Sequence, residues 1–446
     1  MNTRSKTGKP RSNLTRALIC AVLGGLAFGF VPGFSQAEED QDAGALLLAD
    51  KTPDAVAQAS DWRTYIEGAY GGYTQRDGNP AQQNHRLSFD VQYDNSFAPG
   101  WRALFGDRLD IAWPPQIIDQ NSIDQKSINT IKDAYLSWQT QSNTIFDVGR
   151  INVHEGVATG YNPTDYFRNG AVRSIVSADP ASLKENRQGS VMLRGQTLWD
   201  SGSVTALVSP KLSVQQNNSG FNPDWSATNN QNRWLLAVSQ KVSDNINPQF
   251  LIYQEAKLPT QLGFNLTGLL NDATIAYVEW SGGNSPSQLT QALSQQGFPH
   301  ANDSAFRNRL SSGLTYTTSN KISLTAELEY DGGGMDQSDW NALYRQSPLK
   351  YEIYREWLLV VRELPTRQTV FLHAGWQDAM IIHLDLSAME YADMVDYSRM
   401  SWLEARYHLT HAEFALQWQR FSGKPLSDYG ISPQSQSWQA VLRYYF

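Results

Sequence analysis

The chain has 446 residues, a formal net charge of −8 and one cysteine, Cys20. This acidic balance argues against nucleic-acid binding, which requires a basic surface. The length is compatible with two or three soluble domains, but the sequence contains no evident linker between packed cores.

The first 37 residues have the features of a secretory signal peptide. Five basic residues precede the apolar run 17–30, and Ser35 and Ala37 occupy the small-residue positions of a cleavage site. We expect cleavage near Ala37, which removes Cys20 and leaves 31 basic and 44 acidic residues. The remaining chain cannot depend on disulfides, and no later apolar stretch reaches the length of a membrane-spanning helix.

Apolar and polar residues alternate along most of the chain after residue 61. From His85 onward, Leu87, Phe89 and Val91 share one parity, while charged and polar residues occupy the other. The same pattern recurs in the runs 322–331, 402–409 and 413–419. A period of two places the two sets on opposite faces of a β-strand, so the chain is predicted to be all-β.

The polar parity distinguishes a membrane barrel from a soluble sandwich. It carries more charge than one solvated sheet face needs, and tryptophans such as Trp101 and Trp138 stand near strand ends. Short turns near Ala98, Leu270 and Leu409 alternate with long polar connections, for example 210–231 and 284–305. These features predict a transmembrane antiparallel β-barrel over residues 62–446, with long extracellular loops.

The last strand supports the same assignment. Trp438, Ala440, Leu442, Tyr444 and Phe446 share one face, and the chain ends on Phe446. This resembles the C-terminal insertion signal of Gram-negative outer-membrane β-barrels. The resemblance implies an outer-membrane location, contact with lipid and lipopolysaccharide, and insertion by the barrel-assembly machinery. By analogy it also suggests a homotrimer, and it makes residues 38–61 a short periplasmic tail.

About nineteen runs have strand character, whereas bacterial single-chain barrels have an even number of strands. The run 352–364 is the exception, because its apolar residues have helical spacing, and it is either a loop helix or part of the next strand. We therefore predict about 18 strands, with 16 as the next choice.

Charges on the polar parity predict a lumen that carries both signs. The predicted lumen-lining residues are Arg86, Asp90, Asp94, Arg102, Arg108, Asp110, Glu327, Glu329, Asp385, Glu404 and Arg406. Fixed charges in a wetted pore select and orient solutes, which favours small polar or charged cargo.

One long segment, 150–187, departs from the alternation. It contains a turn signal at Asn162–Asp165 and a capped short helix after Asp179. In position and length it resembles the third outer loop of porins, which folds inward and narrows the pore. An inward constriction and an outward structured loop both remain open. The candidate pore or ligand-binding residues are Arg150, His154, Glu155, Asp165, Arg168 and Arg173, in which the arginines pair with anionic groups and the acids balance or orient them.

Motifs for catalysis are absent from the sequence. Neither an H-E-x-x-H arrangement nor a G-x-S-x-G elbow occurs, and the histidine spacing indicates no structural metal site. We expect no enzyme activity and no cofactor, although calcium bound by loop carboxylates remains open. The predicted function is a passive, porin-like channel. The alternatives are a barrel that assists export or assembly of a polymer or surface structure, and a lipid or peptide hydrolase.

Overall fold

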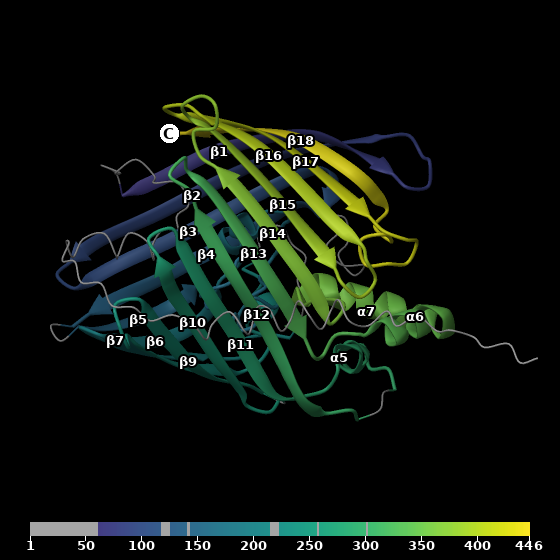
Figure 1. The fold of residues 1–446 in the computed structure, drawn as a ribbon. Helices are drawn as coiled ribbons and strands as arrows, with labels where there is room; N and C mark the ends of the chain where they lie inside the picture. Colours follow the sequence, from purple (N-terminus) through teal and green to yellow (C-terminus); the bar gives the residue numbers. More distant parts are fainter. Residues whose placement is uncertain (1–60, 117–124, 141–142, 215–222, 257, 300–301) are drawn as a thin grey trace, which may run out of the picture. The chain divides into compact units, whose positions relative to one another are not determined.

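The computed structural model describes residues 61–116, 125–140, 143–214, 223–256, 258–299 and 302–446. Residues 1–37 and almost all of the tail 38–61 lie outside the described residues. Figure 1 shows the strands wrapped into a barrel. The first nine are β1 (Trp62–Gln75), β2 (Gln82–Ala98), β3 (Trp101–Gln116), β4 (Gln125–Gln139), β5 (Thr144–Ile151), β6 (Ser190–Trp199), β7 (Gly202–Ser209), β8 (Arg233–Gln240) and β9 (Ile246–Glu255).

The second half of the barrel continues in the same manner. Its strands are β10 (Gln261–Asn271), β11 (Thr274–Ser285), β12 (Ala305–Thr317), β13 (Ile322–Asp331), β14 (Gln368–Trp376), β15 (Leu384–Asp393), β16 (Arg399–His408), β17 (Ala412–Ser422) and β18 (Gln434–Tyr445). The helices are α3 (Pro180–Glu185), α4 (Trp225–Thr228), α5 (Gln288–Gln295), α6 (Gln337–Gln346) and α7 (Pro348–Val361).

Each strand pairs antiparallel with its neighbour in the sequence, and β18 pairs with β1 to close the sheet. Closure satisfies the backbone hydrogen bonds of both edge strands, as a membrane environment requires. The predicted fold and the count of 18 strands are confirmed. Most of the run 352–364 forms α7, so the loop-helix alternative is the correct one.

The predicted alternation describes the two faces of the wall. Phe89, Leu324 and Leu416 are 37%, 47% and 50% exposed on the outside, whereas Asp90 and Glu327 are buried at 1% on the inside. Among the described residues, no helix combines the length and apolarity needed to cross a membrane.

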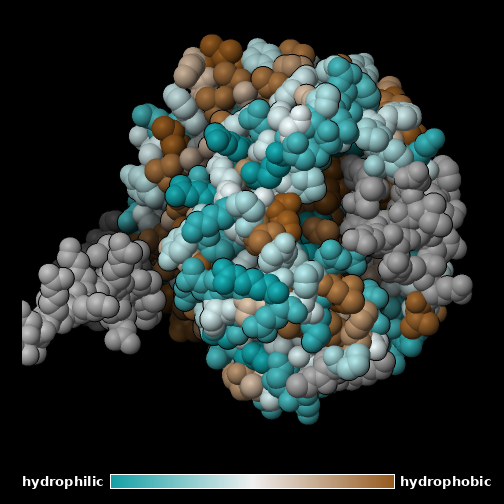
Figure 2. Space-filling model, turned by 90° about the vertical axis from the view of Figure 1, so that its right-hand side faces the viewer, coloured by the Kyte–Doolittle hydropathy of each residue, from teal (hydrophilic) through white to brown (hydrophobic). Residues whose placement is uncertain are grey.

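The two ends of the barrel differ in their connections. Turns such as 99–100 and 272–273 are short at one end, where Trp101 stacks on Trp138 at 5.8 Å between ring centroids. At the other end, the long connections include α5, α6 and α7, which pack around Trp340 and Tyr354. Figure 2 faces this end, and hydrophilic residues cover most of it around a hollow.

Candidate functional site

The connection between β5 and β6, residues 152–189, lies inside the barrel, and we call it the inserted segment. The carbonyl of Val176 accepts hydrogen bonds from Arg86 of β2 and from Gln439 of β18. The carbonyl of Gly160 accepts one from Tyr391 of β15. Further contacts reach β4, β10, β11 and β13. A segment that bonds to strands on every side of a closed sheet occupies its interior.

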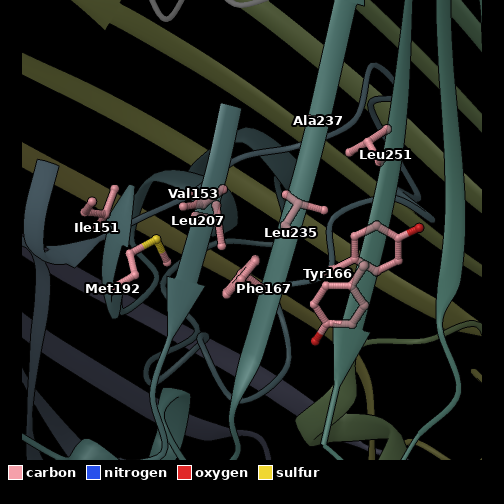
Figure 3. Close-up of a cluster of buried hydrophobic side chains, with 10 residues drawn as sticks. Ile151, Val153, Tyr166, Phe167, Met192, Leu207, Leu235, Ala237 and Leu251 are labelled. Atoms are coloured by element: carbon pink, nitrogen blue, oxygen red, sulfur yellow. The ribbon is translucent and has the colours of Figure 1, made fainter. Parts of the chain in front are cut away.

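An apolar contact anchors this segment to one wall. Val153, Tyr166 and Phe167 are less than 10% exposed, and they pack with inward-facing side chains of β6–β9 (Figure 3). The wall residues are Met192, Leu207, Leu235, Ala237, Leu251 and Tyr253. Tyr166 stacks on Tyr253 with ring centroids 4.3 Å apart. Burial of these side chains favours the inward position, because they would meet water in an outward loop.

Glu279, at the centre of the inner face of β11, anchors the segment through hydrogen bonds. Its Oε2 accepts from the backbone N–H groups of Val157 and Ala158 at 2.9 and 3.1 Å, and from Asn162 Nδ2 at 3.1 Å. Its Oε1 accepts from the N–H and the hydroxyl of Thr164 at 2.8 and 2.9 Å. Five donors therefore surround one buried carboxylate and offset the cost of its burial.

Glu327 of β13 repeats this arrangement two strands away. Its oxygens accept from the N–H groups of Thr159 and Gly160 at 2.5 and 2.9 Å, and from Tyr277 Oη at 2.5 Å. A Cβ on Gly160 would lie 2.4 Å from Glu329 Oε1 and 2.8 Å from Phe371 Cγ. Glycine is needed here because the backbone itself approaches the carboxylates.

Gly156 meets the other carboxylate in the same way. Its φ is +97°, and a Cβ would lie 2.6 Å from Glu279 Oε1. These contacts give a structural reason for two of the four glycines in the stretch Gly149–Gly170. Its backbone donors serve carboxylates of the barrel wall rather than another strand.

Ion pairs within the segment stabilise its shape. Arg187 pairs with Asp165, and Arg187 Nε donates to Asn152 Oδ1 at 2.8 Å. Asp179 caps α3, with its carboxylate accepting from the N–H groups of Ala181 and Ser182. The capped helix and the turn at 162–165 agree with the sequence prediction.

The three arginines proposed as anion ligands have acceptors within the protein. Arg150 donates to the carbonyls of Gly189 and Pro223 and lies over the Trp225 ring. Arg173 pairs with Asp224 at 2.5 Å, and Arg168 pairs with Glu363 at 2.6 Å. Their pairing with a solute stays a prediction, and their observed contacts join the inserted segment to the outer connections.

Glu363 is the centre of that outer junction. It accepts from Tyr161 Oη at 2.6 Å and also pairs with Arg309 at 3.1 Å. Arg168 and Arg309 lower the pKa of Glu363 to about 2 against the opposing effect of its burial. It therefore remains ionised through the physiological pH range.

The remaining two candidates of the segment differ in exposure. His154 is exposed, whereas Glu155 is half-buried and accepts from Gln249 Nε2 at 3.3 Å. Burial, with a smaller contribution from Asp165, raises the pKa of Glu155 to about 7. The charge of Glu155 therefore changes near neutral pH.

Charges on β1–β4, joined by Arg443 of β18, form a compact buried cluster around Glu67. Its carboxylate accepts from Arg86 at 2.6 Å, from Arg108 at 2.9 Å and from Arg443 at 2.7 Å. Lys132 pairs with Asp90 at 2.7 Å, and Arg108 Nε with Asp110 at 3.0 Å. The side chains of Arg86, Arg108 and Asp110 are at most 8% exposed, so this cluster braces the wall.

A second inward-facing group, on β15–β18, keeps contact with solvent. Arg406 bonds to both oxygens of Glu404 at 2.9 Å and pairs with Glu413 at 2.8 Å. His408 lies 3.1 Å from Asp385 and 3.5 Å from Glu413. Side-chain exposure is 20% for Arg406, 22% for His408 and 30% for Asp385.

One ion pair joins the inserted segment to β1, the strand next to this wall. Glu185 of α3 is 34% exposed and lies 3.7 Å from Arg63 of β1, which is 26% exposed. Partly exposed charged side chains therefore lie on α3, on β1 and on β15–β18. The β6–β9 wall is apolar and covered by the segment.

Two of the predicted lumen-lining residues, Asp94 and Arg102, do not line the interior. Asp94 and Arg102 form an ion pair at the short-turn end, with side chains 49% and 51% exposed. They mark the rim of the barrel rather than its interior.

Sequence reasoning missed Glu67, Glu279 and Glu363. Glu279 stands between the outward-facing Val278 and Trp280, so the local alternation was a usable signal for it. Glu363 carries no comparable signal, because it follows a helix and acquires its role from Arg168 and Arg309.

Both ring nitrogens of His408 face carboxylates, which leaves neither positioned as a free catalytic base. Among the described residues, no group of three or more histidine, cysteine, aspartate or glutamate side chains could hold a metal ion.

No family model and no curated protein matches the chain. Solved structures do share its fold. Acinetobacter baumannii OccAB1 aligns with a TM-score of 0.56 and 11% identity, over 86% of this chain and 96% of that one. Pseudomonas aeruginosa OccK2 (OpdF) in complex with glucuronate gives 0.52 and 9%, over 86% and 97%. A BenF-like porin from Pseudomonas fluorescens Pf-5 gives 0.51 and 9%, over 87% and 99%.

Proposed function

We propose that this protein is a passive, porin-like channel of the Gram-negative outer membrane for small charged or polar solutes. The observation that carries the proposal is the inserted segment, which is fixed against β6–β13 inside a barrel whose β15–β18 and β1 carry partly exposed charge. A structured segment inside a closed barrel narrows the lumen without needing any chemical step.

The shared fold supports this function. One structure with the same fold is described as a porin, and another holds glucuronate, a small carboxylate. The proposal includes cleavage near Ala37, a periplasmic tail over residues 38–61, insertion by the barrel-assembly machinery, and an outer surface in contact with lipid and lipopolysaccharide.

The solute path is proposed to follow the charged wall beside α3. Arg406, Glu404, His408 and Asp385 offer both signs of charge within this space. A solute that carries an anionic group and hydroxyls would exchange water for these groups one after another, which is how weak multi-site binding permits passage.

Planar-bilayer recording of the purified protein tests the channel. We expect discrete conductance steps, and we expect Arg406→Gln to shift the reversal potential in a KCl gradient toward cations, because Glu404 and Glu413 then lose their counter-charge. Arg420→Gln is the matched control, since Arg420 is exposed on the outer face of β17. The recording uses salt near 0.1 M, where the Debye length is about 10 Å, so charges closer than this to the solute still act on it. Absence of conductance, or equal shifts for both variants, would contradict the proposal.

A further inference from the structure

A polar residue interrupts the apolar outer face of β3. Trp101, Phe105 and Trp113 are 39%, 39% and 45% exposed on this face. Asp107 stands on the same parity, midway between the two tryptophans. Its register partners are Val91 of β2 and Ile131 of β4, which are also outward-facing. The carboxylate therefore lies on the outside of the barrel, halfway between the two ends of the apolar belt.

Asp107 has one hydrogen-bond donor on the neighbouring strand. Asn129 Nδ2 donates to Asp107 Oδ1 at 3.0 Å, and Asn129 pairs in register with the outward-facing Leu109. This bond uses one of the two amide hydrogens and one of the two carboxylate oxygens. The backbone N–H of Arg108 also interacts with the carboxylate. Because a carboxylate has about four acceptor sites, the pair still has a further donor and a further acceptor side by side.

Hydrocarbon cannot satisfy these remaining groups. An acidic side chain facing lipid near the midplane destabilises a barrel, and polar groups at membrane depth are retained where they bind one another. Asp107 is too short to reach the aqueous boundary from the middle of the belt. The surface around it therefore favours a protein neighbour that supplies both a donor and an acceptor.

We propose that the outer face of β2–β4, centred on Asp107 and Asn129, is a two-fold interface between two copies of this chain. Rotation by 180° about the membrane normal keeps depth unchanged, so it brings the second amide hydrogen of Asn129 in one copy to a remaining acceptor site of Asp107 in the other. Both contacts form at once, since the interface is self-complementary. No other partner is guaranteed to offer this pattern at this depth.

The surrounding side chains suit such a contact. Phe89, Phe105 and Leu136 are 37%, 39% and 44% exposed around the pair, on strands that are adjacent in Figure 1. Packing of these side chains against their own copies would exclude lipid from the polar centre. The inference rests on the proposed placement of the barrel in a bilayer, but it does not depend on which solute passes.

Site-specific crosslinking in proteoliposomes tests the interface, because the chain after the predicted cleavage site contains no cysteine. We expect Leu109→Cys to give a crosslinked product of two barrels with a short bis-maleimide. Leu328→Cys is the matched control, because Leu328 is 37% exposed on the outer face of β13, outside the proposed interface. Adding Asp107→Leu or Asn129→Leu to Leu109→Cys should lower the crosslinked fraction about tenfold.

Heat-modifiable migration on gels shows whether each variant is folded, and conductance of the same liposomes tests the channel separately. Asp107→Leu and Asn129→Leu test the same interface, so the test still stands if one of the two variants fails to fold. The absence of a crosslinked product from Leu109→Cys, equal crosslinking at positions 109 and 328, or crosslinking unchanged in folded Asp107→Leu overturns the interface. Loss of conductance with crosslinking intact overturns only the channel.

Discussion

Replacing Glu279 with glutamine should loosen the inserted segment while preserving the shape of the side chain. Oε2 serves three donors and Oε1 serves two, so the glutamine amide must turn its NH₂ toward one set. Turning the NH₂ group toward Thr164 costs less than turning it toward the three other donors. The hydroxyl of Thr164 can then accept a hydrogen bond from the amide, whereas the backbone N–H of Thr164 is left without an acceptor.

The cost of this substitution has two parts. One backbone N–H of the segment loses its acceptor, and the bonds to Val157, Ala158 and Asn162 lose the assistance of a charge. Together these changes amount to about 3 kcal/mol, given that a hydrogen bond to a charged group contributes roughly 1.5–3 kcal/mol. Since 1.4 kcal/mol corresponds to a tenfold change, the ratio of seated to unseated segment should fall about 150-fold.

Single-channel recording and limited proteolysis together measure this change. We expect Glu279→Gln to show brief events of larger current and faster protease cleavage within residues 152–189 of the folded barrel. Glu390→Gln is the matched control, because Glu390 accepts from Ser401 and pairs with Arg399 on the outer face near the rim. Current noise and cleavage rates equal to those of the wild type would refute the role of Glu279.

Three other substitutions test the remaining contacts of the segment. Gly160→Ala should unseat it at a cost of about 1–3 kcal/mol from overpacking, whereas Gly68→Ala, where a Cβ meets nothing within 4 Å, should leave current noise unchanged. Phe167→Ala should remove about 3–5 kcal/mol from the apolar anchor, seen as faster proteolysis of the segment; a wild-type rate would argue against that anchor. Burial raises the pKa of Glu155 to about 7, so ionisation of this carboxyl disfavours the seated position of the segment. This free-energy penalty is absent below about pH 4.5, grows as the pH rises, and is complete above about pH 7. Cleavage should therefore accelerate between pH 5 and 8 in the wild type and less in Glu155→Gln, and identical profiles would contradict this assignment.

The barrel could be predicted from the sequence because its rule is local. A strand requires only that neighbouring residues alternate, and runs such as 85–95 and 322–331 satisfy this without reference to the rest of the chain. The helix α7 was identifiable for a similar reason, since its apolar spacing departs from a period of two.

The direction of the inserted segment could not be predicted in this way. It depends on Glu279 and Glu327, which lie more than 100 residues farther along the chain and meet the segment only after the barrel has closed. The arginines illustrate the same difficulty. Sequence shows that Arg168 and Arg173 are basic, but their acceptors Glu363 and Asp224 lie in two other connections.

The two anchors of the segment differ in kind, and this has a consequence for the channel. The β6–β9 contact is hydrophobic, whereas the contacts to β11 and β13 are charge-assisted hydrogen bonds to buried carboxylates. Ionic strength changes the hydrophobic contact only weakly. It also barely screens the hydrogen bonds to the buried carboxylates, because these are shielded from solvent. The solvent-exposed charges of Arg406 and Asp385 are, in contrast, open to screening. Salt should therefore alter ion selectivity along the charged wall while the width left by the segment stays constant, so the two properties can be separated in one recording.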